Sequence, residues 1–464
     1  MSLPQTIGEL RESGYHDRSV KHEMRQNLIE KLRRNEPIFP GIVGYEDTVI
    51  PQIESAVLAG HDIVLLGERG QAKTRIARAL VSLLDEAVPV IAGCEINDSP
   101  FQPICAHCRG RIESEADDTP ITWLTRDRRY GEKLATPDIT IADLIGEVDP
   151  IKVAEGRYLS DELTIHYGLI ARTNRGIFCI NELPDLAERI QVGLLNIMEE
   201  RDVQIRGYKV RLPLDLYVVV SANPEDYTNR GRIITPLKDR FGAQVRTHYP
   251  KTIEHEIAVM EQEQSVFEDA GYTTVVPTFM KEVVAEITHL ARRSPEVSQR
   301  SGVSARVTIC NYESLLSSAL RRAVRLDEKT IVPRVSDFPA VVASTQGKIE
   351  LETVGDTREE KVVEKLINGA ILAVFNRHGS VGEFEGVLSR FERGFNVEVG
   401  ENISSDRYVR ICNELPELRA AITRLGNSSD PGVSASVVEF VLEGLHLNRK
   451  LNKDRSAGKT RYRR

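Results

Sequence analysis

Hydrophobic and polar positions follow two different periods along the chain, and the period changes near residue 250. Residues 1–36 are polar with apolar residues at helical spacing, which predicts an N-terminal helical arm. From 37 to 250, short apolar runs alternate with amphipathic stretches. Short apolar runs predict buried strands, and their alternation with helices predicts a parallel sheet that is covered on both faces. This part of the chain is therefore predicted to have an α/β fold.

Strand-like runs become rare after residue 250. Apolar residues recur every three or four positions, for example over 278–293, which predicts a helical domain over 251–350. Thr357 and Glu360 stand three residues apart, as in a capping box, and predict the start of another helix. Residues 351–464 are therefore predicted to form a helical C-terminal extension.

Composition narrows the class of protein. With 464 residues, 41% of them hydrophobic and 28% charged, the chain has the composition of a globular protein of two or three domains. Its longest apolar runs are far shorter than the ~20 residues that a membrane-spanning helix needs, so no membrane partner is expected. The first residues lack the apolar core of a secretory signal, which makes the cytoplasm the expected compartment.

Charge is distributed unevenly. The formal net charge is -8, yet residues 449–464 hold eight Lys or Arg against one Asp. The acidic balance of the whole chain argues against a nucleic-acid partner, whereas a basic end can contact nucleic acid or an acidic protein. We expect this end to be a mobile, solvated tail.

A phosphate-binding loop is predicted directly after an apolar strand at 61–66. Its residues are Gly67, Glu68, Arg69, Gly70, Gln71, Ala72, Lys73 and Thr74, and an amphipathic helix follows. Backbone N–H groups of such a turn donate to phosphate oxygens, Lys73 adds a positive charge, and Thr74 offers a hydroxyl to Mg2+. Ala72 replaces the glycine that usually precedes the lysine and requires a backbone angle that tolerates a Cβ. The pattern predicts nucleotide binding.

Two further predicted strands end in polar side chains. Asn181 and Glu182 follow the apolar run 177–180, and Asn223 comes shortly after the run 216–220. Ligands of open α/β sheets bind at the carboxyl ends of the strands, so these side chains are expected near the phosphate loop. Glu182 can orient and deprotonate a water molecule, and Asn223 can hold that water or the terminal phosphate. Asn181 offers only a dipole where a carboxylate normally holds the water shell of magnesium, which is expected to lower magnesium affinity or turnover.

Arginines gather after the third of these strands. Arg230, Arg232 and Arg240 stand on the stretch that follows Asn223. A planar guanidinium suits the spread charge of a phosphoryl group in transfer, so one of them can serve as an arginine finger if it reaches the nucleotide of a neighbouring subunit. In a monomer the same residues would form a basic surface patch.

The order of these motifs resembles an AAA+ ATPase, and more narrowly the magnesium-chelatase I-subunit and MoxR branch, which carries an insertion in its second core helix. The resemblance covers roughly residues 37–345. The segments that carry it are GIVGYED, GERGQAKT, CINE, SANPED and KDRFG, joined by DLIGEVDP in the insertion and by a hairpin over 198–215. The fold that it implies is a P-loop αβα parallel-sheet core, then an α-helical lid, with the helical extension behind them.

The resemblance also implies roles for single residues. Lys73 and Thr74 would bind the phosphates of ATP and Mg2+, Asn181 would stand beside the metal, and Glu182 would activate water. Asn223 would be sensor 1, Arg240 the arginine finger and Arg306 sensor 2. Members of this family form homo-oligomeric rings, usually hexamers, with the nucleotide between subunits. They remodel a partner, often a protein with a von Willebrand A domain, and that domain would have to lie on another chain because no DxSxS motif occurs here.

Three functions follow from these features. The first is an ATP-hydrolysing ring motor that remodels a partner protein. The second, favoured by Asn181, is a nucleotide-gated binding or scaffold protein with weak hydrolysis. The third is a DNA-acting or transcription-activating motor, which the basic end favours, while the acidic net charge and the absence of a GAFTGA loop oppose it.

Three cysteines form a separate pattern. Cys105 and Cys108 make a CxxC knuckle, and Cys94 stands upstream of it. Such a set can hold zinc, can serve an iron–sulfur or redox role, or can consist of plain reduced thiols. The spacing provides no fourth ligand, since His107 lies inside the knuckle and points poorly for joining it. Cys179, Cys310 and Cys412 lie in apolar or helical stretches and are expected in the core.

Overall fold

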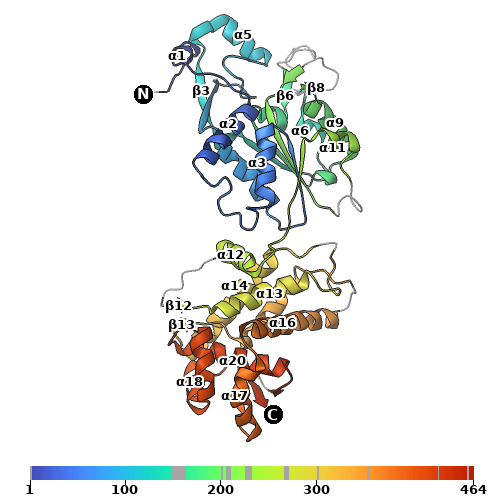
Figure 1. Ribbon diagram of the computed structural model, residues 1–464. Helices are drawn as coiled ribbons and strands as arrows, with labels where there is room; N and C mark the ends of the chain where they lie inside the picture. Colours follow the sequence, from blue (N-terminus) through green and yellow to red (C-terminus); the bar gives the residue numbers. More distant parts are fainter. Residues whose placement is uncertain are drawn as a thin grey trace. The chain divides into compact units, whose positions relative to one another are not determined.

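The chain folds into two compact units, Met1–His248 and Tyr249–Arg464 (Figure 1). The computed structural model describes residues 3–148, 164–199, 202–204, 211–224, 232–265, 271–299, 302–352, 356–426, 428–456 and 459–464. Among these, none of the helices combines the length and apolar composition that a bilayer crossing requires.

The first unit is built on a five-stranded sheet in the order β11-β1-β10-β7-β4. All four neighbouring pairs are parallel, which confirms the predicted α/β class. The strands are β1 (Ile63–Leu66), β4 (Tyr130–Leu134), β7 (Gly176–Asn181), β10 (Leu216–Ala222) and β11 (Ala243–Arg246). Because β10 lies between β1 and β7, the three strands that carry the predicted motifs are direct neighbours.

Helices cover both faces of this sheet. Every residue of β7 and β10 is buried, as expected for central strands between two layers. Successive residues point to opposite faces, so Phe178 belongs to one hydrophobic cluster and Cys179 to the other. Figure 1 shows α2 (Val20–Arg33) and α3 (Val49–Ala59) on one side, and α9 (Glu188–Glu199) and α11 (Thr235–Arg240) on the other.

Shorter elements surround the sheet. They are α1 (Ile7–Glu12), α4 (Lys73–Ala79), α5 (Ala106–Glu115), α6 (Ile141–Leu144), α8 (Leu169–Arg172), and the antiparallel strand pairs β2 (Ala87–Ile91) with β3 (Ile121–Thr125), β5 (Gly146–Val148) with β6 (Ile165–Tyr167), and β8 (Asp202–Gln204) with β9 (Arg211–Pro213). The pairing of β8 with β9 confirms the predicted hairpin. β2 pairs with β3 outside the parallel sheet, and Pro89 of β2 has no N–H group to donate to a further strand.

The N-terminal segment packs into the first unit through a buried ion pair. The Arg129 guanidinium donates to both carboxylate oxygens of Glu23 in α2, at 2.7 and 2.6 Å, and both side chains are at most 3% exposed. Val20 N donates to Asp215 Oδ2 at 2.8 Å, and Trp123 Nε1 donates to Pro4 O at 2.9 Å. The predicted arm therefore rests on the core in this structure.

Glu23→Ala is expected to destabilise the first unit. The substitution leaves the Arg129 charge buried without its carboxylate, which typically costs about 3–5 kcal/mol. The thermal unfolding midpoint of this unit should fall by about 10 °C. Glu30→Ala removes an exposed carboxylate of the same helix, paired with Arg34 at 3.6 Å, and should leave the midpoint unchanged. Equal midpoints for wild type and Glu23→Ala would contradict the anchoring role.

The second unit is mainly helical. Its helices are α12 (Ile253–Glu263), α13 (Thr278–Ala291), α14 (Arg306–Leu326), α15 (Val341–Gln346), α16 (Asp356–His378), α17 (Glu385–Glu392), α18 (Ser405–Glu414), α19 (Arg419–Ala421) and α20 (Pro431–Leu447), and β12 (Thr273–Thr274) pairs with β13 (Thr330–Ile331). One hydrophobic cluster draws on both predicted segments, 251–350 and 351–464. Phe279 of α13 packs on Phe440 of α20 with ring centroids 4.4 Å apart.

The basic end is folded, so the expectation of a mobile tail was wrong. β15 (Asn452–Ser456) and β16 (Lys459–Arg463) form a three-stranded sheet with β14 (Val397–Val399). Strand alternation turns Tyr462 inward, where it is 1% exposed and donates to Glu443. A count of the charges in this segment does not reveal the alternation of inward and outward side chains. Local acids also pair with its basic residues, for example Asp454 with Arg463 at 2.7 Å.

Candidate active site

Three predicted site residues meet at the ends of neighbouring strands. Lys73, at the start of α4 after β1, donates from Nζ to Asn223 Oδ1 at 2.6 Å. Asn223, just beyond β10, donates from Nδ2 to Glu182 Oε2 at 2.5 Å, and Glu182 directly follows β7. Lys73 is 7% and Asn223 is 6% exposed. A lysine, an amide and a carboxylate thus form one hydrogen-bonded line across three adjacent strand ends.

The loop between β1 and α4 curls around the lysine. Besides Asn223, Lys73 Nζ donates to the carbonyl oxygens of Gly67 and, at 2.9 Å, Glu68. Gly67 is required by close packing, since a Cβ there would lie 1.9 Å from Thr247 Oγ1. Ala72 has φ 56 and ψ 15, so the position where a glycine was expected does adopt the left-handed conformation, at a cost of about 1–2 kcal/mol for a residue with a Cβ.

A side chain of the loop occupies one of its amide donors. Gln71 Oε1 accepts from Glu68 N at 3.0 Å and from Thr247 Oγ1 at 2.8 Å. Tyr45, from the GIVGYED segment, donates from its hydroxyl to Gln71 O at 3.0 Å, and burial raises the pKa of Tyr45 to about 12. A cavity of about 310 Å³ opens beside the loop. It is lined by Leu66, Gly67, Glu68, Gln71, Pro224, Lys238, Gln244, Arg246 and Thr247.

Glu182 is held in an unusual backbone conformation. Its φ is 56 and its ψ is 46, in the left-handed region that residues with a Cβ avoid. The Glu182 N–H donates to Ser221 Oγ of β10 at 3.2 Å, which fixes the turn at the end of β7. Strained backbone of this kind is concentrated at functional sites. The conformation accompanies the contact between the Glu182 carboxylate and Asn223.

Asn181 has a carboxylate beside it that the sequence did not reveal. Asn181 Nδ2 donates to Glu132 Oε1 at 2.6 Å, and Arg78 Nε donates to the other oxygen of Glu132 at 2.8 Å. Glu132 stands on β4, which pairs with β7 at the edge of the sheet. The negative charge that a carboxylate at position 181 would carry is therefore present on Glu132, which accepts a hydrogen bond from Asn181. The pairing of β4 with β7 brings it there, and no motif signals that pairing.

Asn181→Asp alone is expected to impair the site. The substitution places a second carboxylate against Glu132, and two like charges at that distance raise the pKa of one of them. Loss of the charge-assisted hydrogen bond should lower the free energy of unfolding by about 2 kcal/mol. Asn181→Asp combined with Glu132→Gln restores one carboxylate and one amide and should recover stability. Thermal unfolding and magnesium-dependent turnover measure both effects, and a single variant that is as stable as wild type and faster would contradict this reading.

The other predicted residues are not part of this hydrogen-bonded line. Arg240 ends α11 and donates from Nε to Glu199 Oε2 at 2.9 Å, and the exposed Arg232 lies 3.9 Å from Glu188. Thr74 is half-buried in the first turn of α4. Arg306 is the exposed first residue of α14, in the second unit. Arg230 falls outside the described residues.

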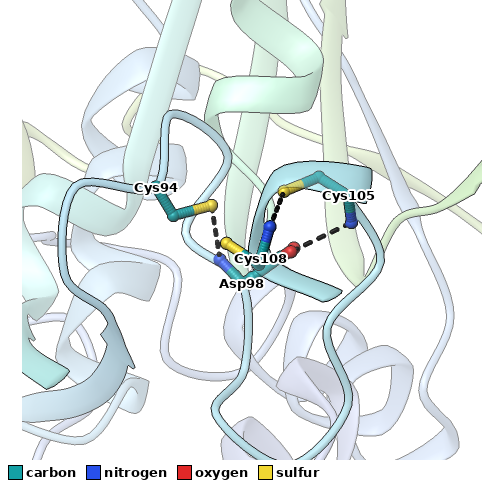
Figure 2. Close-up of side chains that lie close together, drawn as sticks. All are labelled: Cys94, Asp98, Cys105 and Cys108. Carbon is teal, nitrogen blue, oxygen red and sulfur yellow. Dashed lines mark hydrogen bonds between the residues drawn. The ribbon is translucent and has the colours of Figure 1, made fainter. Parts of the chain in front are cut away.

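The predicted cysteines come together and gain a neighbour. Figure 2 shows Cys94, Cys105 and Cys108 around Asp98, with their ligand-type atoms all within 4.8 Å of one another. Hydrogen bonds from the thiols of Cys105 and Cys108 lower the pKa of Cys94. Burial raises the pKa of the Asp98 carboxyl. The cysteine spacing does not reveal Asp98, because this residue lies between Cys94 and the CxxC knuckle.

The chain is similar to curated proteins over about half of its length. No family model matches the chain. It is 29% identical over 244 residues to the "Magnesium-chelatase 38 kDa subunit" of Rhodobacter capsulatus, a match that covers 49% of this chain and 61% of that protein. It is 27% identical over 246 residues to "Magnesium-chelatase subunit ChlI" of Chlorella vulgaris, covering 51% and 64%. Each match spans less than two thirds of the relative.

Solved structures that are similar to this chain have low sequence identity to it. The complex between subunits BchI and BchD of magnesium chelatase contains a chain that is 22% identical to this one, with a TM-score of 0.36. The match covers 70% of this chain and 98% of that chain. NtrX from Brucella abortus in complex with ADP is 16% identical, with a TM-score of 0.38, and the match covers 76% of this chain and 66% of NtrX.

Proposed function

We propose that the chain binds ATP with Mg2+ and hydrolyses the ATP. Its similarity to magnesium-chelatase subunits supports this proposal, and so does the resemblance of its motifs to AAA+ ATPases. One observation carries the proposal. The hydrogen-bonded line from Lys73 through Asn223 to Glu182 joins a phosphate loop to a carboxylate across adjacent strand ends. Ligands of parallel sheets bind at that edge.

The residues of the site suit a triphosphate. Lys73 holds a buried ammonium group at the loop, where Gly67, Glu68 and Asn223 accept from it, and phosphate oxygens would bring negative charge to that ammonium. In a loop of this type, the N–H groups of the turn and of the following helix start would donate to the phosphate oxygens. Mg2+, held through Thr74 and the amide of Asn181, would neutralise charge on the phosphates.

Glu182 and Asn223 would then act on water. Glu182 can take the proton of the attacking water, and Asn223 can fix the direction of the Glu182 carboxylate through the 2.5 Å contact. Lys73 would stabilise charge that develops on the transferred phosphoryl group, in a site shielded from water. The presence of all three groups at one edge of the sheet supports hydrolysis in addition to binding.

A ring completes the proposed mechanism. Arg240 stands at the C-terminal end of α11, where it pairs with Glu199 at the surface of the first unit. We assign it to the nucleotide of a neighbouring copy, which requires a homo-oligomeric ring, for which the resemblance implies a hexamer. The energy of ATP hydrolysis would drive the remodelling of a partner protein with a von Willebrand A domain. This remodelling would take place in the cytoplasm.

The environment of Asn181 supports a second candidate function. Its amide donates to Glu132, and Arg78 also donates to Glu132, so the negative charge near the proposed Mg2+ position is partly neutralised. Such a site could bind ATP firmly and turn it over slowly. The chain would then be a nucleotide-gated scaffold, whose assembly depends on ATP binding and not on hydrolysis.

Phosphate release and particle mass distinguish these functions. The full chain should release phosphate from ATP only with Mg2+, at a rate in the ordinary range of about 1 per second or above. Mass photometry should show larger assemblies with ATP than without it. Lys73→Ala should abolish both, whereas Lys348→Ala, at an exposed position in the second unit, should change neither. ATP-dependent assembly without phosphate release would favour the scaffold.

A further inference from the structure

The four side chains of the cysteine cluster come from one short stretch of the first unit. Cys94 follows β2, Cys105 is the N-cap of α5, and Cys108 lies in its first turn. Asp98 stands on the loop between them and is 0% exposed, while Cys105 and Cys108 are 3% and 0% exposed. The loop thus places three sulfurs and a carboxylate around one buried point (Figure 2).

Asp98 lacks a partner on one oxygen. Its Oδ2 accepts from Ile104 N at 3.1 Å and from Cys105 N at 3.0 Å. Its Oδ1 is buried with no hydrogen-bond partner in the structure. A buried carboxylate oxygen left in this state is costly, and cations commonly compensate buried carboxylates. The unsatisfied oxygen belongs to the cluster whose other members are thiols.

Backbone N–H groups are aimed at two of the sulfurs. Asp98 N donates to Cys94 Sγ at 3.4 Å, and Cys108 N donates to Cys105 Sγ at 3.3 Å. Hydrogen bonds of this kind stabilise sulfur atoms that carry negative charge, as they do around metal-bound thiolates. The loop therefore supplies both the ligands and the donors that surround them.

We propose that Cys94, Asp98, Cys105 and Cys108 bind one Zn2+ ion in a tetrahedral site. Bond lengths of about 2.3 Å to sulfur and 2.0–2.2 Å to oxygen place neighbouring ligands of such a site about 3.6–3.8 Å apart. The four ligand atoms already lie within 4.8 Å of one another, so small side-chain shifts suffice. Three thiolates select a soft metal, and one carboxylate in place of a fourth thiolate favours zinc over an iron–sulfur cluster.

The site is structural and not catalytic. Four protein ligands close the zinc coordination shell and leave no position for a substrate or a water. The same loop is fastened to the segment before β7, where Asn97 Nδ2 donates to Arg172 O at 2.7 Å and Asn174 Nδ2 donates to Ile96 O at 3.0 Å. Glu182 stands at the other end of β7. Zinc would hold the β2–α5 loop against the sheet, independently of whether the chain hydrolyses ATP.

Metal analysis of the full chain tests the proposal. Protein purified under reducing conditions should contain about one equivalent of zinc and no visible absorbance. Cys94→Ser and Cys108→Ser should each lose most of it, while the control Cys310→Ser, outside the cluster, should keep it. Cobalt exchanged into wild type should produce the visible bands of a tetrahedral cobalt–thiolate centre. This last measurement decides the matter even if the cysteine variants fail to fold.

Asp98 has its own test. Asp98→Ala should lose the metal, whereas Asp98→Cys should keep it and strengthen the thiolate-to-cobalt charge-transfer absorption. A role confined to accepting backbone hydrogen bonds would not be rescued by cysteine in this way. Zinc below about a tenth of an equivalent in wild type, together with no tetrahedral cobalt spectrum, overturns the proposal, and so does an iron chromophore or a Cys105–Cys108 disulfide under reducing conditions.

Discussion

Glu182→Gln is expected to lower the turnover of ATP about 10²–10⁴-fold, while ATP affinity changes little. Glutamine keeps the size of the side chain and can still contact Asn223, but it cannot accept a proton from water. The left-handed backbone at φ 56 is retained, because both residues carry the same Cβ. The loss should therefore appear in kcat and not in binding.

Steady-state phosphate release and equilibrium titration with ATP measure these two effects separately. Glu188→Gln, an exposed position at the start of α9 whose side chain is 68% exposed, serves as the matched control and should keep the wild-type rate. If Glu182→Gln retained turnover within threefold of wild type, the water-activating role would belong to another residue.

Arg240→Ala should reduce turnover about 10³-fold or more, the scale on which arginine fingers act. The proposal places Arg240 at the nucleotide of the next subunit, so the variant should still bind ATP at its own phosphate loop. Arg128→Ala, which removes an exposed arginine of the same unit, should be nearly silent.

Mixing the Arg240→Ala and Glu182→Gln variants tests which subunit supplies the arginine to the nucleotide. Arg240→Ala and Glu182→Gln subunits are each inactive alone. In a mixed ring, some interfaces combine an intact Glu182 from one subunit with an intact Arg240 from its neighbour, and part of the activity should return. No recovery, despite demonstrated mixing, would place the arginine in the same subunit as the glutamate or outside the mechanism.

Much of this site could be predicted because it depends on local patterns. A strand followed by a glycine-containing turn, lysine and helix is a contiguous signal, as is an apolar run that ends in Asn181 and Glu182. Parallel strands then bring their carboxyl ends to one edge, which explains why Lys73 and Asn223 could be expected to meet.

Other features depend on pairings that the sequence does not display. Glu132 reaches Asn181 only because β4 becomes the neighbour of β7. Asp98 joins the cysteines through the path of a loop and not through a recognisable ligand spacing. The strands near Tyr462 were concealed by a run of basic residues, since charge counting does not register which side chains face inward. All three features depend on tertiary contacts.

The central claim is that the loop ending in Lys73 binds a nucleotide phosphate. Calorimetric titration tests this claim most directly. The full chain is titrated, in the presence of Mg2+, with ADP and with a slowly hydrolysed ATP analogue. We predict one site per chain with a micromolar dissociation constant. Lys73→Ala should weaken binding about 10–100-fold, because a charge-assisted contact to phosphate contributes about 1.5–3 kcal/mol. No binding by wild type at millimolar nucleotide, or equal affinity in both proteins, would contradict the account.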